Sequence, residues 1–345
     1  MNLYGVDIGY GYVKGVSDLG RRVLFPSVVK QAPEGGALSE VFGKSQLDYR
    51  LRIVNGETDQ TVLVGDAALA GDPVRSWDSR ASARRDYETL LLTALAAMGA
   101  QGAVRVALGM PLSLFADKAE RQQMKMRLTG LTAWVALNNA EEPVMIDIAA
   151  VSVYPQAVGA YLAAVGSALD SRGLAGKPVG LVDIGFRTTD YLLLSAVHGK
   201  IVPEEQLSGS LDQGVGLAFR QAAALVSKEH GLGFVLPSTM LEEAFAGDGE
   251  IVVGGQTISA TGYVERALKA LGKEIGDQIK GLWASRLDRV SAVLVVGGGG
   301  RAVCPFLDLG ISNVSVWSDP VYANALGFLA LARDQEAAVV KAQRA

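Results

Sequence analysis

Two stretches of the chain share one pattern of apolar and polar positions. A strand-like run from Leu3 to Val6 leads into Asp7-Ile8-Gly9, and an apolar run from Val179 to Val182 leads into Asp183-Ile184-Gly185. In both copies a glycine-bearing turn and a second extended stretch follow, which is typical of a β-hairpin. The copies start about 176 residues apart, which is too long a period for a solenoid and indicates two like domains.

Helical periodicity appears in other parts of the chain. Apolar residues recur at three- and four-residue steps from Val264 to Leu282, and an alanine-rich helical stretch runs from Tyr87 to Met98. Short strands are expected at Val104 to Leu108 and at Ala292 to Val296, and the second runs into Gly297 to Gly300. Alternating strands and helices of this kind indicate the α/β class.

The same patterns predict the domain organisation. We expect a first domain at 1–170 and a second at 171–345, with the C-terminal helix at 320–345 packing back on the first domain. Asn55-Gly56 lies between two strand patterns, so it predicts a hairpin in a small inserted subdomain at about 31–66. A second insertion at about 217–260 has Gly254-Gly255 as its expected hairpin turn.

The uncharged stretch from Ile148 to Leu169 has about the length that a bilayer span requires. Pro155, Gly159 and Gly166 interrupt it, so we predict a buried helix instead. The N-terminus does not have the pattern of a signal peptide. The single cysteine, Cys304, admits no disulfide within the chain, which suits a reducing compartment. We therefore expect a cytoplasmic protein with no membrane contact.

The charge balance argues against one class of partner. The chain has 32 Lys and Arg residues against 36 Asp and Glu residues, which gives a net charge of −4. Binding to a phosphate backbone is driven mainly by basic surface charge. Direct contact with nucleic acid is therefore not expected.

The two Asp-x-Gly hairpins have a chemistry in common. Turns of this kind can present backbone N–H groups to a polyphosphate, and Asp7 and Asp183 could hold Mg²⁺ through its waters. The glycines from Gly297 to Gly300 would let the backbone approach a nucleoside. No glycine run is followed by Lys-Ser or Lys-Thr, and no Gly-x-Gly-x-x-Gly opens a helix after Val6. P-loop and Rossmann sites are thus excluded.

These motifs resemble those of the actin, chaperone and sugar-kinase superfold. Within it they are most similar to bacterial and archaeal actin-like proteins of the ParM or StbA plasmid-segregation type, over nearly the whole chain. The segments that carry the resemblance are Asp7 to Lys14, Phe25-Pro26-Ser27, Val64 to Ala68, Gly109 to Leu112, Asp183 to Asp190, Gly297 to Gly300 and Tyr322 to Phe328. The resemblance implies an α/β, actin-like fold of two similar domains around a nucleotide cleft, each with a small inserted subdomain.

The resemblance also implies roles for individual residues. Asp7 and Asp183 match the acids near Mg²⁺, and Lys14 matches the lysine that reaches the phosphates. Gln156 matches the residue that orients the attacking water, and because glutamine is a poor base, slow turnover is expected. The implied nucleotide contacts are Gly9, Tyr10, Gly11, Tyr12, Lys14, Gly185, Phe186, Arg187, Thr188, Thr189, Gly297, Gly298, Gly299 and Gly300. The implied cofactors are ATP and Mg²⁺, with the choice of ATP or GTP left open.

Some residues depart from the family pattern. Tyr10 and Tyr12 stand where actin has small or hydroxyl residues, and Phe186-Arg187 replaces the glycine pair of many second loops. Hydroxyl contacts to phosphate are therefore expected from Thr188 and Thr189, in the second loop. Glu265 and Lys269 lie near the expected nucleoside position, although such a spacing is more typical of a surface ion pair.

The resemblance implies a filament-forming ATPase. Binding of Mg-ATP between the domains would favour head-to-tail self-assembly, and hydrolysis would weaken the subunit contacts. Plasmid or other DNA segregation would then require a separate DNA-binding adaptor. Two alternatives of the same superfold stay open: a scaffold that binds nucleotide without polymerising, and a small-molecule kinase that uses Asp147 or Asp190 as its base.

Overall fold

A computed structural model describes residues 1–32, 48–55, 58–69, 80–138, 140, 142–164, 177–197 and 200–344. Contacts divide the chain into two compact units. The first unit consists of Met1–Ala163 and Tyr322–Ala345, and the second of Ala164–Val321. The described helices include none with the length and apolar character needed to cross a membrane.

A mixed nine-stranded sheet forms the first unit. Its strands lie in the order β3 (Arg22–Pro26), β2 (Tyr12–Ser17), β1 (Asn2–Ile8), β7 (Gly102–Met110), β9 (Val144–Pro155), β8 (Thr132–Leu137), β5 (Asp48–Asn55), β6 (Thr58–Gly65) and β4 (Val29–Gln31). The central neighbours β1, β7 and β9 run parallel, and β1 forms the expected antiparallel hairpin with β2. The hairpin of β5 and β6 is confirmed as well, whereas Gly56 in its turn lies outside the described residues. These strands extend the main sheet through β8.

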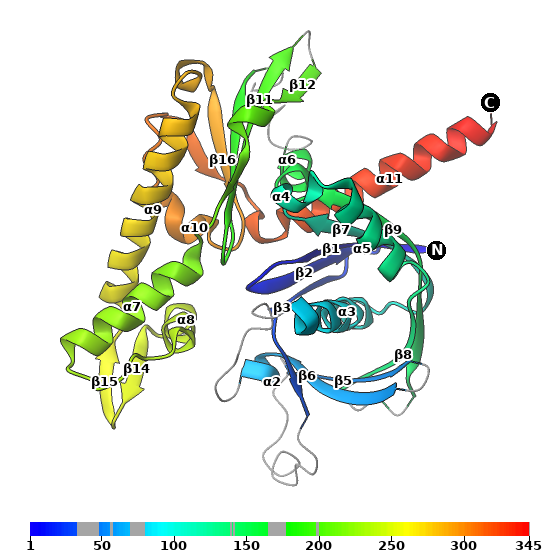
Figure 1. The fold of residues 1–345 in the computed structure, drawn as a ribbon, viewed down its shortest axis with the longest axis horizontal. Coiled ribbons are helices and arrows are strands. Elements are labelled where there is room, and N and C mark those ends of the chain that lie inside the picture. The colour runs from blue at the N-terminus through cyan, green and yellow to red at the C-terminus, as the bar shows by residue number, and fades with distance from the viewer. Residues whose placement is uncertain are drawn as a thin grey trace. The chain divides into compact units, whose positions relative to one another are not determined.

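Helices pack against this sheet on two sides. The sheet curls around α3 (Arg80–Ala97), which confirms the helix expected from Tyr87 to Met98 (Figure 1). Its buried residues include Leu90, Leu91, Ala94 and Leu95, which have helical spacing. On the other side, α11 (Ala323–Arg344) packs against β1, β2 and β7. The remaining helices are α2 (Asp66–Leu69), α4 (Leu112–Phe115), α5 (Lys118–Leu128) and α6 (Val158–Ala164).

The predicted buried helix from Ile148 to Leu169 is wrong over its first part. Strand β9 continues to Pro155, and only then does α6 begin. Ile146 and Ile148 are both fully buried at alternate positions, which is the period of a strand, and β-branched residues pack well on a pleated surface. An apolar run of this length does not by itself distinguish a strand from a helix. Residues 165–169 lie outside the described residues.

A second sheet forms the framework of the second unit. Its order is β12 (Lys200–Pro203), β11 (Thr189–Val197), β10 (Val179–Ile184), β16 (Ala292–Val296) and β17 (Val314–Val316), with β13 (Gly209–Leu211) paired to β11. The hairpin of β10 and β11 is confirmed, and β16 runs parallel to β10. The glycine run that follows β16 therefore lies beside the turn that follows β10.

Two long helices cover the core of the second unit. The expected apolar periodicity is confirmed in α9 (Thr261–Trp283), which packs against α7 (Val215–Glu229). The Trp283 indole is fully buried in this core, where it packs against Gly180 and donates to the Leu207 carbonyl at 2.8 Å. The other elements are α8 (Ser238–Ala246), α10 (Gly300–Val303) and the predicted hairpin of β14 (Glu250–Val253) and β15 (Gln256–Ser259).

Candidate functional site

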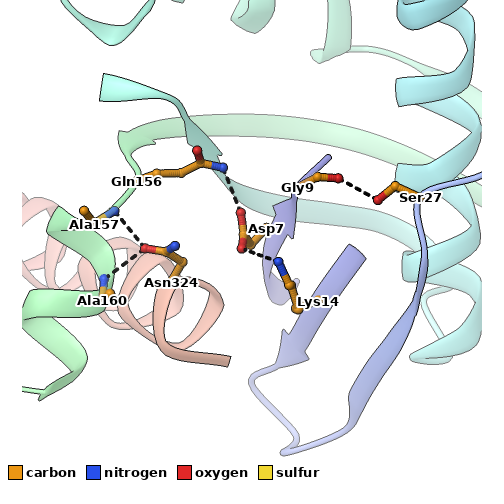
Figure 2. Close-up of polar contacts among 8 residues, drawn as sticks. All are labelled: Asp7, Gly9, Lys14, Ser27, Gln156, Ala157, Ala160 and Asn324. Atoms are coloured by element: carbon orange, nitrogen blue, oxygen red, sulfur yellow. Dashed lines mark hydrogen bonds and ion pairs between the residues drawn. The ribbon is translucent and has the colours of Figure 1, made fainter. Parts of the chain in front are cut away.

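Asp7 is the centre of a polar cluster in the first unit. It is the penultimate residue of β1, only 4% exposed, and Lys14 lies directly opposite on β2. The Lys14 ammonium contacts Asp7 Oδ2 at 3.3 Å, and Gln156 Nε2 donates to Asp7 Oδ1 at 2.9 Å (Figure 2). Lys14, from the same hairpin, and Gln156, which is 149 positions away in sequence, thus meet at the Asp7 carboxylate.

The contact with Asp7 determines how the Gln156 amide is oriented. An ionised carboxylate only accepts hydrogen bonds, so the NH₂ group of Gln156 must face it. The amide oxygen, Oε1, therefore points away from Asp7 and can accept a hydrogen bond from another donor such as water. This orientation suits a side chain that positions a water molecule without removing its proton.

Tyr87 is a neutral neighbour of this cluster. Burial raises the pKa of its hydroxyl well above the ordinary value, with the positive charge of Arg127 opposing that rise and the negative charge of Asp7 adding to it. Tyr87 therefore stays protonated at neutral pH, and the charge at this end of β1 comes from Asp7 and Lys14.

Backbone contacts fix the first turn. Gly9 N donates to the Tyr12 carbonyl at 3.1 Å, and the Ser27 hydroxyl donates to the Gly9 carbonyl at 2.6 Å (Figure 2). Ser27 N also donates to the Gly11 carbonyl at 2.9 Å. A Cβ atom at Gly9 would lie 3.0 Å from the Lys14 ammonium, so glycine leaves room for that side chain. Tyr12 is partly exposed at the edge of the turn.

The second unit has a similar hairpin, in which a carboxyl group takes the position of the lysine. Asp183 is the penultimate residue of β10, it is buried, and Asp190 takes the position opposite that Lys14 takes in the first unit. Two buried carboxylates at directly opposite positions repel each other, which favours a nearby cation. The first hairpin thus carries an ion pair, and the second carries two carboxyl groups at opposite positions.

The structure places the side chains of the second loop differently. Thr189 is fully buried and donates its hydroxyl to the Gln213 carbonyl at 2.7 Å, so this hydrogen bond is structural. Thr188 stays partly exposed, and its carbonyl accepts from Gly185 N at 2.9 Å. The Phe186 ring packs against Gly216 and the core, while the exposed Arg187 pairs with Asp212 at 3.3 Å.

The glycine run meets this hairpin at Gly297. Gly297 has a φ of +86°, and its N–H donates to the Pro320 carbonyl at 2.9 Å. A Cβ atom at Gly297 would lie 2.4 Å from both Asp183 Oδ1 and the Ile184 carbonyl. Gly299 N donates to the same Ile184 carbonyl at 2.9 Å. The Asp183 loop and the run from Gly297 to Gly300 therefore form one continuous surface.

We expect Gly297→Ala to destabilise the second unit. The methyl group would collide with Asp183 and with backbone, and φ is positive, so a loss of about 2 kcal/mol or more in the free energy of unfolding is expected. The control is Gly298→Ala, because a Cβ atom there meets nothing within 4 Å. Urea unfolding measures both variants, and equal stability of the two would contradict the described geometry.

A cavity of about 450 Å³ lies between the end of α8, the first turns of α9 and the segment that follows the glycine run. Its wall includes Thr261, Glu265 and Leu268 of α9 and Ala302 and Phe306 just after the glycines. The volume is in the range of small-molecule sites. Glu265, which the sequence places either near the nucleoside or in a surface pair with Lys269, is a wall residue of this cavity, whereas no local motif marks Thr261, Ala302 or Phe306.

The described residues contain no group of three or more His, Cys, Asp or Glu side chains that could hold a metal ion by themselves. Mg²⁺ in nucleotide sites typically keeps several waters and is held by one or two carboxylates together with phosphates. Asp7 and Asp183 are buried carboxylates at turns, so they fit that donor set.

Comparisons with known proteins agree with this geometry. The family described as "Actin like proteins N terminal domain" matches residues 5–159, and "Archaeal actin homologue MreB-like, C-terminal" matches residues 181–308. The chain belongs to the actin-like proteins. Two curated relatives are both described as "Archaeal actin homolog". The one from Thermoplasma volcanium is 25% identical over 95% of this chain and 98% of its own, and the one from Thermoplasma acidophilum is 26% identical over the same shares.

Solved structures confirm the actin-like fold. A ParM filament from Clostridium botulinum has a TM-score of 0.85 at 21% identity, covering 96% of this chain and 99% of its own. An archaeal actin homolog in complex with ADP has a TM-score of 0.75 at 23% identity, covering 97% of this chain and 100% of its own. The predicted family and fold are therefore confirmed for this actin-like protein.

Proposed function

We propose that this actin-like protein binds Mg-ATP, hydrolyses it slowly and assembles into head-to-tail filaments that hydrolysis destabilises. The observation that carries the proposal is the Asp7 cluster, in which one buried carboxylate holds both a lysine and a glutamine amide. A solved archaeal homolog with bound ADP and a solved ParM filament support the nucleotide and the assembly. GTP in place of ATP stays an alternative.

Both units would contribute to holding Mg-ATP. Asp7 and Asp183 would hold the waters of Mg²⁺, which supplies positive charge to the phosphates when bound. Lys14 would turn from Asp7 towards the phosphates. Its side chain is flexible, and a single contact of 3.3 Å connects its ammonium to Asp7. Backbone N–H groups of the two turns, other than those of Gly9 and Gly185, which donate to the Tyr12 and Thr188 carbonyls, would bind phosphate oxygens.

Gln156 would position the attacking water. Its Nε2 donates to Asp7, so its Oε1 is left to accept a hydrogen bond from a water molecule. That hydrogen bond would fix the direction of the water's lone pair. Neither atom of the amide is a useful base at neutral pH, so the rate comes from orientation and from charge stabilisation. Slow hydrolysis follows, which suits an enzyme whose hydrolysis limits filament lifetime.

The cavity lined by α9 and by Ala302 and Phe306 would hold the nucleoside. Apolar walls from Leu268 and Phe306 suit a base, and Thr261 and Glu265 offer polar contacts to base or ribose. We expect Ala302→Phe, which fills the cavity, to weaken Mg-ADP binding about tenfold or more, as measured by isothermal titration calorimetry. The control is Ala270→Phe, at an exposed position of α9. If the two variants bind Mg-ADP with equal affinity, the nucleoside does not bind in this cavity.

The filaments would move DNA, and a second protein would connect the filament to the DNA. The net charge of −4 gives no general attraction to a phosphate backbone, so a separate DNA-binding adaptor would connect filament and cargo. Plasmid segregation is the role that the ParM resemblance favours. Electron microscopy of the protein with Mg-ATP, with and without candidate adaptors and DNA, tests this part of the proposal.

A further inference from the structure

Asn324 connects the start of the C-terminal helix α11 to the segment that carries Gln156. Asn324 is 7% exposed, and its Oδ1 accepts hydrogen bonds from Ala157 N at 3.0 Å and Ala160 N at 3.2 Å (Figure 2). Ala157 directly precedes α6 and Ala160 lies in its first turn, where backbone N–H groups have no partner within the helix. A single buried amide therefore satisfies two of them from a distant part of the chain.

The segment that Asn324 holds has an unusual conformation. Val158 N donates to the Gln156 carbonyl at 2.8 Å, and the residue between them, Ala157, has a φ of +65°. This is a γ-turn with a positive central φ, which is rare and strained for a residue other than glycine. Ala157 is fully buried, so surrounding contacts can keep the turn in place. The turn begins at Gln156, the residue whose side-chain direction matters for the proposed reaction.

Close packing limits the other conformations of this segment. On one side, Gln156 N donates to the Met110 carbonyl at 2.8 Å. On the other side, α6 and α11 approach so closely that a Cβ atom at Gly327 would collide with the backbone of Gly159. The Phe328 ring fills the space over Gly159 and Gly109. The Asn324 contacts add support at the γ-turn itself, through the N–H group of its central residue, Ala157.

We propose that Asn324 is a positioning residue for Gln156. By accepting from Ala157 and Ala160, it holds the strained turn whose first residue is Gln156, and so directs the Gln156 amide to Asp7. The effect on hydrolysis rests on the proposed function, whereas the effect on the Gln156 side chain does not. The start of α11 is thereby coupled to the water-orienting group.

Enzyme kinetics test this role through a matched pair of variants. Asn324→Ala removes both hydrogen bonds, and it should lower kcat for Mg-ATP about tenfold while KM changes less than about threefold. Asn324→Asp keeps an acceptor at the same reach, and a carboxylate is favourable at a helix N-terminus, so it should restore most of the rate. In a Gln156→Ala background, Asn324→Ala should cause no further loss of kcat, because Asn324 acts through the Gln156 side chain and that side chain is absent.

An NMR measurement on the nucleotide-free protein separates this proposal from the proposed function. The side-chain NH₂ resonances of Gln156 are assigned by their loss in Gln156→Ala. We expect Asn324→Ala to shift or broaden them, Asn324→Asp to leave them near the wild-type position, and those of the exposed Gln256 to stay unchanged in both. If Asn324→Ala does not fold, Asn324→Ser, whose hydroxyl has a shorter reach, replaces it with the same expectation.

Two results would overturn the proposal. One is a Gln156 resonance pair that Asn324→Ala or Asn324→Ser leaves unchanged, and the other is an equal fall in kcat with and without Gln156. A wild-type protein that turns over no nucleotide would contradict the proposed function alone, since the resonances of Gln156 would still decide whether Asn324 positions it.

Discussion

Replacing Asp7 with alanine is expected to lower the affinity for Mg-ATP at least about 100-fold, which is a loss of about 2.7 kcal/mol in binding free energy. The carboxylate is buried, pairs with Lys14 at 3.3 Å and anchors Gln156 at 2.9 Å. Its removal would take away the acceptor proposed for Mg²⁺-bound water, and it leaves a largely buried ammonium without its partner. Isothermal titration calorimetry with Mg-ATP measures the change.

The matched control for Asp7 is Asp59→Ala. Asp59 also pairs with a cation in the first unit, Arg52, at 2.6 Å, but both side chains are about half exposed. Exposed pairs of this kind contribute little to stability and should not affect nucleotide binding. An Asp7→Ala protein that is folded by circular dichroism and binds Mg-ATP as tightly as Asp59→Ala would remove Asp7 from the nucleotide site.

Replacing Gln156 with alanine is expected to lower the hydrolysis rate about 100-fold, with less than a threefold change in affinity for Mg-ATP. In the proposed mechanism the side chain would orient water in the transition state and would not hold the phosphates, so kcat should change and binding should not. Phosphate release measures the rate. Filaments of the variant should also persist after those of the wild type have disassembled, because their ATP is consumed more slowly.

Gln256→Ala is the control for this second variant. Gln256 is an exposed residue of β15, far in sequence from the Asp7 cluster, and its removal should leave the rate unchanged. A Gln156→Ala protein that hydrolyses Mg-ATP at the rate of Gln256→Ala would mean that another group orients the water.

Local patterns in the sequence were sufficient to predict the strands that carry the two aspartates. The copies at Asp7 and Asp183 have the same spacing, so strand, turn and pairing follow from alternation and glycine placement. The long helix α9 was equally predictable from its apolar stripe. The stretch after Ile148 was not, because a buried strand and a buried helix both consist of uninterrupted apolar residues.

Contacts between distant parts of the chain could not be read from local patterns. The Gln156 amide reaches Asp7 across 149 positions, and Asn324 reaches Ala157 across 167. The collision that excludes a side chain at Gly297 depends on the Ile184 carbonyl of a neighbouring strand. The family resemblance suggested which residues matter, but only the packing of β1, β9 and α11 brings Asp7, Gln156 and Asn324 together.

The most direct test of the central claim is right-angle light scattering of the purified protein after addition of Mg-ATP, with Mg-ADP in a parallel sample. We predict a rise with Mg-ATP that decays as ATP is consumed and a much smaller rise with Mg-ADP. A flat trace with Mg-ATP over a wide range of protein concentration would contradict a self-assembling actin-like ATPase and would favour a nucleotide-binding scaffold or a small-molecule kinase of the same fold.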